Sequence, residues 1–135
     1  MEQLSSRSGI TVDALKQCNS EEIIKDYFDC LAGDCIISID ECDIESLEGK
    51  ISKSDRAVEV RTLDVKSVEE GKERIVELFR HTDSRDCILM LSGDVTIESF
   101  GGIISNIDMT IGDANVVFAL KNKKTQGIKM TCIAY

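Results

Sequence analysis

The sequence contains no proline, and its nine glycines are scattered rather than clustered. The residue that most often breaks a helix or a strand is therefore missing, so the ends of elements must be read from Gly, Ser, Asn and Asp. No G-x-G or G-x-x-x-x-G-K-S/T run stands between a strand pattern and a helix pattern. Because a backbone cradle for phosphates needs glycines at such a junction, the sequence excludes a phosphate loop of this kind.

Metal-ligand patterns are also missing. The only histidine is His81, and the six cysteines form no C-x-x-C pair. A zinc site usually takes its ligands from such pairs, so we expect no metal and no cofactor. Cys87 and Cys132 fall at apolar strand positions, where a thiol acts as a small core hydrophobe. We interpret the cysteines as structural, with a redox or metal role as the alternative. Catalysis by a cysteine would need His81 nearby, and His81 fits a helix C-terminus better.

Basic charge is scarce: 25 acidic residues against 16 basic ones give a net charge of −9. This charge repels phosphate backbones and anionic membranes, so we expect neither nucleic acid nor a membrane as a partner. The N-terminus lacks an apolar signal region, and no run reaches the roughly 20 apolar residues of a membrane span. The sequence therefore predicts a cytoplasmic protein. The one basic cluster, Lys121, Lys123 and Lys124, fits a solvated hairpin between the last two strands better than an anion or partner site.

The length and composition suit one domain. A folded chain of 135 residues buries roughly two-thirds of the surface that its unfolded form exposes. No linker or low-complexity segment interrupts it. We expect a single structural domain, in which an N-terminal helical segment (1–33) packs on an α/β core (34–135).

The first half of the chain carries mainly helix signals. Helices are predicted over 11–17, over 20–31 after the capping box Asn19-Ser20-Glu21-Glu22, and over 44–51. A strand is predicted over 57–63. A second capping box, Ser67-Val68-Glu69-Glu70, then opens a helix with an apolar face of Val68, Ile75, Leu78 and Phe79.

The last third of the chain indicates an α/β layer. Residues 87–91 are wholly apolar, as in a strand buried on both faces. Asp94 is expected to cap a helix whose apolar side carries Ile97, Phe100, Ile104 and Ile107. Residues 114–120 suit another buried strand, and 128–135 alternate as a half-exposed one. The fold class is an α/β two-layer sandwich, a four-stranded mixed sheet with helices, plus the N-terminal helices. Only the first two helices remain for the second sheet face, so part of it should be free for self-association.

Four short patterns resemble the C-terminal domain of FtsZ, the bacterial tubulin relative that polymerises at the division site. Ser92-Gly93-Asp94 is followed by Phe100, six positions after the Asp. Asp113-Ala114-Asn115-Val116-Val117-Phe118 and Ile128-Lys129-Met130-Thr131-Cys132-Ile133-Ala134 come next. Upstream, Ser38-Ile39-Asp40-Glu41-Cys42-Asp43 is similar to the family's loop of an Asn, an apolar residue, an Asp, two residues and a second Asp, with Ser38 in place of the Asn. The resemblance covers residues 31–134.

The resemblance implies an FtsZ C-terminal-like domain without the GTP-binding half, so this chain should not bind or hydrolyse GTP alone. It implies a non-enzymatic interaction domain in cell division that binds FtsZ or tubulin-like subunits or itself, as a homo-oligomer. In FtsZ-like filaments, the matching acidic residues reach the nucleotide of the next subunit and help to position water. The resemblance assigns that role to Asp40 and Asp43. We favour the alternative of a solvated acidic loop, or of Asp43 as the N-cap of the next helix.

A second class of function remains open. Small α/β domains of similar topology, such as chorismate-mutase-like proteins, can form oligomers with small-molecule or enzymatic sites between subunits. Such a site would be expected to gather arginines for carboxylates. Five arginines are available for such a site, but no sequence pattern brings them together: Arg56, Arg61, Arg74, Arg80 and Arg85.

Overall fold

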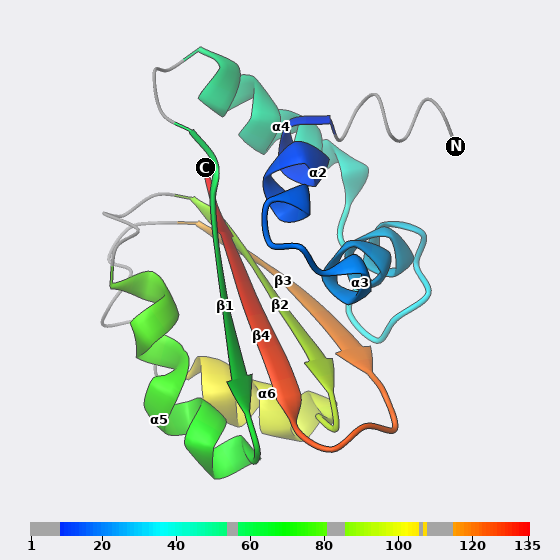
Figure 1. The fold of residues 1–135 in the computed structure, drawn as a ribbon, viewed down its shortest axis with the longest axis vertical. Coiled ribbons are helices and arrows are strands. Elements are labelled where there is room, and N and C mark those ends of the chain that lie inside the picture. The colour runs from blue at the N-terminus through cyan, green and yellow to red at the C-terminus, as the bar shows by residue number, and fades with distance from the viewer. Residues whose placement is uncertain (1–8, 54–56, 81–85, 106, 108–114) are drawn as a thin grey trace.

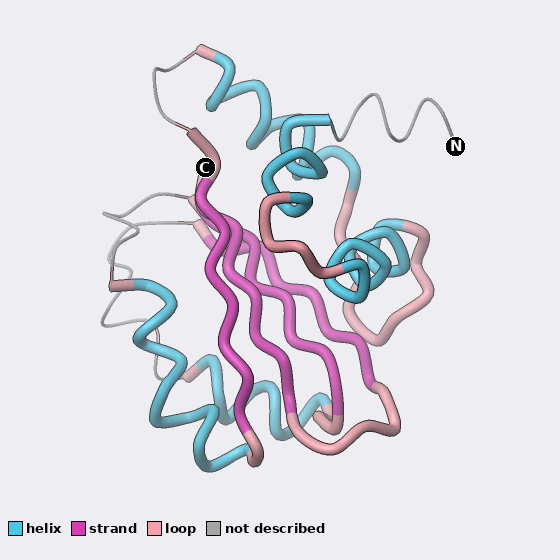
Figure 2. Tube along the Cα trace, viewed as in Figure 1, coloured by secondary structure: helices cyan, strands magenta, loops and turns pink. Residues whose placement is uncertain are grey.

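The computed structural model describes residues 9–53, 57–80, 86–105, 107 and 115–135 (Figures 1 and 2). The helices are α2 (Gly9–Lys16), α3 (Glu21–Leu31), α4 (Glu41–Ser52), α5 (Val68–Phe79) and α6 (Ile97–Ile104). The strands are β1 (Glu59–Val65), β2 (Cys87–Gly93), β3 (Val116–Asn122) and β4 (Ile128–Ala134). The expectations for Arg56, His81, Arg85 and the start of the 113–118 motif lie outside the described residues.

The strands form one mixed sheet in the order β1-β4-β2-β3. β4 is antiparallel to both β1 and β2, while β2 and β3 are parallel. The four-stranded mixed sheet is therefore confirmed. The hairpin that we expected between the last two strands is wrong, because β2 lies between β3 and β4 and the connection crosses its end.

The two central strands are buried on both faces. Every residue of β2 is buried, as predicted for 87–91. In β4 only Lys129 keeps partial exposure, so the expectation of a half-exposed strand is wrong. Ile133 and Tyr135 pack under the N-terminal helices, whereas Met130 and Cys132 face the other side of the sheet.

Helices cover both faces of the sheet (Figure 1). On one face α5 and α6 bury Ile75, Phe79, Phe100 and Ile103 against the strands. On the other face α2, α3 and α4 pack over the sheet, with side chains that include Leu15, Ile23, Tyr27, Ile44 and Leu47. The expectation of a partly free apolar face is wrong, because α4 joins the first two helices there. Among the described residues, the exposed large hydrophobic side chains are separated in the chain: Ile10, Ile36 and Ile97.

Short polar side chains start the helices. The Ser20 hydroxyl accepts a hydrogen bond from the Ile23 backbone at the start of α3, and Ser67 does the same for Glu70 in α5. The cap of α6 is Thr96 and not Asp94 as expected. This shift of two residues turns Ile97 outward, where 57% of it is exposed, and brings Ile103 into the core. None of the described helices is long and apolar enough to cross a membrane.

Phe100 should be a main support of the α5–α6 layer. It is buried, and its ring packs edge-on against that of Phe118, with 5.6 Å between the ring centroids. Phe100→Ala should lower the free energy of unfolding by about 3–5 kcal/mol, since it removes apolar contacts and leaves a cavity. Urea unfolding measures this loss. Ile97→Ala, on the exposed side of the same helix, is the matched control, and an equal loss there would contradict this packing.

Candidate functional site

The acidic segment, residues 38–43, comprises the end of the connection from α3 and the first residues of α4. Asp40 is the N-cap of α4, and its carboxylate accepts a hydrogen bond of 2.8 Å from the Cys42 backbone. Asp43 lies in the first helical turn and is exposed. The expectation of Asp43 as the N-cap is therefore wrong. We expected residues 38–43 to form a loop, but residues 41–43 belong to α4. Acidic side chains suit this position, since the helix dipole is positive there.

The acidic segment is held in place by the turn before it. Gly33 adopts φ +84°, which lets the chain reverse after α3, and the Asp34 N–H returns to the Asp29 carbonyl at 2.8 Å. The Ile39 N–H donates to the Cys30 carbonyl at 3.0 Å. Ile37 then pairs with Leu120 at the edge of β3. The two aspartates therefore start from a backbone that is tied to both α3 and the sheet.

Acidic groups of the segment and of α4 act on the Cys42 thiol. The Cys42 thiol is exposed, and it lies between Asp40 and Asp43 in the sequence. Its pKa is raised, and the main cause is the negative charge of Asp40. The hydrogen bond that the thiol donates to Asp40 and the charges of Glu45 and Asp43 act in the same direction.

A second polar cluster, which we call the lysine clasp, joins the end of β3 to α3. Lys121 pairs with Asp29, and Lys123 pairs with Asp26 at 2.8 Å and with Glu22 at 3.2 Å. These pairings replace the solvated hairpin that we expected for the two lysines. A stripe of acids at helical spacing, Glu22, Asp26 and Asp29, was the signal in the sequence.

The clasp is a strong local constraint because one of its charges is buried. Asp26 is only 1% exposed, so removal of Lys123 would leave a buried charge with a large desolvation cost. Burial alone would lower the pKa of Lys123, but its hydrogen bonds with Asp26 and Glu22 raise that pKa overall. The clasp therefore fixes the helix that leads into the acidic segment.

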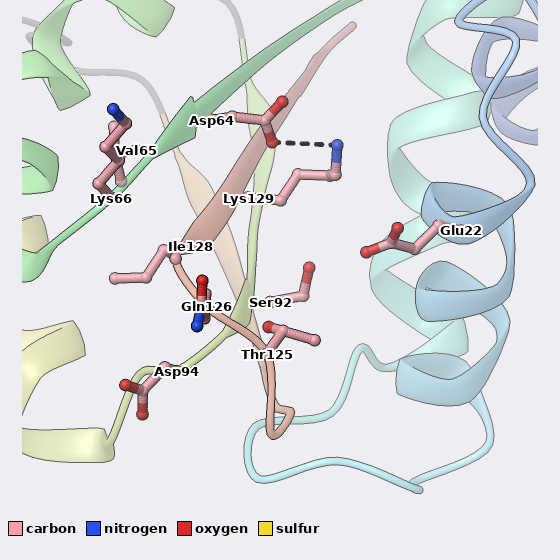
Figure 3. A pocket seen from close by; sticks show the side chains of 11 residues that line it. Glu22, Asp64, Val65, Lys66, Ser92, Asp94, Thr125, Gln126, Ile128 and Lys129 are labelled. Carbon is pink, nitrogen blue, oxygen red and sulfur yellow. Dashed lines mark ion pairs between the residues drawn. The ribbon is translucent and has the colours of Figure 1, made fainter.

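A hollow of about 880 Å³ opens at the end of the sheet where β1 and β2 finish (Figure 3). The strand register places Asp64, Lys129 and Ser92 in one row, with Asp64 and Lys129 paired at 3.0 Å. Glu22 on α3 forms the opposite wall. Ligands of α/β proteins often bind at the carboxyl ends of strands. None of the described lining residues is an arginine, so the groups expected for carboxylate recognition are not gathered here.

Two glycines shape this end of the sheet. Gly93 has φ +129°, and a Cβ on it would lie 2.3 Å from the Gly127 carbonyl oxygen. Gly127 has φ +93°, and its carbonyl accepts a hydrogen bond of 3.1 Å from Asp94. The Ser92-Gly93-Asp94 pattern therefore has a structural cause: only glycine allows this close approach of two backbones.

The known proteins that this chain matches are similar to it in structure. No protein-family model and no curated protein matches the chain. A single-residue mutant of FtsZ from M. jannaschii matches with a TM-score of 0.65 and 10% identity, over 83% of this chain and 36% of the FtsZ chain. CetZ from Methanosaeta thermophila matches with a TM-score of 0.39 and 13% identity, over 70% of this chain and 37% of its own. A thiamine-monophosphate kinase from Stenotrophomonas maltophilia has the same score and identity, over 67% and 40%. At 0.39 neither supports a shared fold.

The FtsZ match establishes the fold. The chain has the fold of part of FtsZ, which confirms the resemblance that the short motifs indicated. It spans 36% of the length of that FtsZ chain, so the activity and partners of the whole FtsZ do not transfer to it directly.

The lysine clasp should make stability depend on acid. Hydrogen bonds from Lys121 and then Lys25 lower the pKa of Asp29 in the folded protein. A lowered pKa adds stability above the unfolded value of about 3.9, and this stability is lost as pH falls through the folded value. Asp29→Asn should therefore lower the free energy of unfolding by at most about 1 kcal/mol at pH 7, since the pair is partly exposed.

The difference between Asp29→Asn and the parent protein should begin to shrink below about pH 4, and it should vanish only below the lowered pKa of folded Asp29, where this carboxyl is neutral in both states. Urea titrations of both proteins, at pH 7 and below about pH 4, measure this difference in the free energy of unfolding. Asp64→Asn is the control, because its pair with Lys129 lies at the surface and should add little. A loss for Asp29→Asn that stays constant with pH would rule out the charge as its cause.

Proposed function

We propose that this chain is a non-enzymatic interaction domain that docks on an FtsZ-like or tubulin-like subunit through its acidic segment. The observation that carries the proposal is the position of this segment: exposed carboxylates stand on a fixed helix start in a domain with an FtsZ fold. The lysine clasp and the Ile37–Leu120 bridge support it, because they reduce the entropy cost of docking.

The two aspartates would have different tasks at such an interface. Asp40 uses its carboxylate to cap α4, so it orders the segment. Asp43 is exposed and is the better candidate to approach a partner. Near a bound nucleotide, a carboxylate can accept a hydrogen bond from water and orient it for in-line attack. This chemistry needs a nucleotide held by the partner, since the present sequence has no phosphate loop.

The proposal places the chain in cell division, in the cytoplasm, where it would cap a filament. Its acidic segment would meet the nucleotide face of one complete subunit. Because these 135 residues contain no phosphate loop, they would offer no nucleotide face to the next subunit. The division into an N-terminal helical segment (1–33) and an FtsZ C-terminal-like part (34–135) belongs to the same proposal.

Filament capping gives the first functional prediction. Added to the FtsZ-like GTPase of the same organism, the protein should shorten filaments at substoichiometric ratios, because each bound copy stops growth at one end. Light scattering and phosphate release measure polymer and turnover. The protein alone should release no phosphate from GTP. Unchanged polymer and turnover at equimolar protein would sink the capping proposal.

Removal of the two negative charges from the acidic segment gives the second functional prediction. Asp40→Asn together with Asp43→Asn should weaken capping and alter nucleotide turnover, while α4 stays folded because Asn is as good an N-cap as Asp. Asp40→Ala would instead cost about 0.5–2 kcal/mol of stability through the lost cap. Glu69→Gln with Glu98→Gln, on α5 and α6, is the matched control. If the control pair weakens capping equally, the docking face lies elsewhere.

Two alternatives to docking on a filament make different predictions. Self-association of this chain would show as dimers or larger species in sedimentation at high micromolar concentration. The hollow at the strand ends favours a small-molecule role, since its volume falls within the usual range for ligand sites. Binding of a small molecule in the hollow, without any effect on filaments, would favour the small-molecule role.

A further inference from the structure

Two cysteines stand on either side of the turn that ends α3. Cys30 lies in the last turn of the helix and is fully buried, whereas Cys35 follows the turn and is partly exposed. The Cys35 sulfur lies 3.9 Å from the Cys30 carbonyl oxygen and 3.1 Å from that of Ile37. The reversal of the chain at Gly33 brings residues five positions apart to the same place.

The two thiols influence each other directly. Burial is the first cause that raises the pKa of Cys30, and the hydrogen bond and charge of Cys35 raise it further. The charge of Asp26 acts in the same direction, and that of Lys121 opposes it. Cys30 therefore stays protonated near neutral pH, while the partly exposed Cys35 is the thiol that an oxidant can reach.

We propose that Cys30 and Cys35 are an oxidation-sensitive pair that closes to a disulfide when a peroxide reacts with Cys35. The Cys35 thiolate attacks the O–O bond of hydrogen peroxide, takes one oxygen as sulfenic acid and releases hydroxide. The Cys30 sulfur gives up its proton and attacks the Cys35 sulfur, so that the S–S bond forms and the sulfenic oxygen leaves as water. In total, two thiols and one peroxide give one disulfide and two waters.

The consequence for the acidic segment rests on the proposed function. The Cys35 thiol now donates to the Ile37 carbonyl and lies 3.7 Å from the Ser38 hydroxyl. A bond to Cys30 removes these contacts and draws residues 35–38 toward α3. Because Ser38 begins the acidic segment, oxidation changes how that segment is presented to a partner. The oxidised and reduced forms should therefore differ in capping.

The test counts thiols in the full chain after treatment with hydrogen peroxide. The protein is unfolded, labelled with a maleimide and mapped by mass spectrometry. Two of its six thiols should be lost to a reducible link between Cys30 and Cys35. In Cys30→Ser, Cys35 should accumulate as a sulfenic acid that a dione probe traps. Cys42→Ser is the control, because this exposed cysteine belongs to α4 and not to the proposed pair, so its replacement should leave the link unchanged.

The outcomes separate this inference from the proposed function. A parent protein in which Cys35 stops at sulfenic or sulfinic acid, or bonds to another cysteine, overturns the pair even if the protein caps filaments. A Cys30–Cys35 link in a protein without effect on filaments supports the pair and contradicts the proposed function. Equal capping by the reduced and linked forms overturns the regulatory step alone.

Discussion

The antiparallel pairing of β4 with β2 is the constraint on which the rest of the structure depends. Both strands are buried on both faces, so neither face of the sheet can be left to water. α5 and α6 cover one face, and the apolar sides of α2, α3 and α4 are needed on the other. Leu15, Ile23 and Tyr27 are among the largest fully buried side chains. The N-terminal helices are thus part of the core, and this fixes the start of α4 where the acidic residues lie.

Buried polar contacts add direction to this packing. The Glu48 carboxylate of α4 accepts two hydrogen bonds from Thr11 of α2, and the Thr11 hydroxyl also meets the Tyr135 hydroxyl. Burial raises the pKa of Tyr135, so it remains neutral there. The lysine clasp acts in the same way along α3, from Glu22 to Asp29. In a chain with a net charge of −9, the clasp uses two of the scarce lysines internally.

The sequence predicted the elements well where a local pattern decides them. The apolar run of β2, the apolar faces of α3 and α5 and the Ser67 cap depend on neighbours along the chain. The errors came from long-range packing: the alternation of 128–135 could not reveal that α2–α4 would cover its polar-looking side. Asp40 and Asp94 both precede helices, and only the first caps one, because the backbone at Gly93 and Gly127 delays α6 by two residues. The clasp was missed because Lys121 and Lys123 find partners about 100 positions away.

The docking proposal is tested most directly by hydrogen–deuterium exchange on this protein, alone and with a nucleotide-loaded FtsZ-like partner. Amides of bound surfaces exchange more slowly, because they open to water less often. New protection should centre on residues 34–45, which span the turn after α3 and the first turn of α4. The exposed sides of α5 and α6 should exchange as before. Protection confined to α5 and α6, or to the hollow at the strand ends, would contradict docking through the acidic segment.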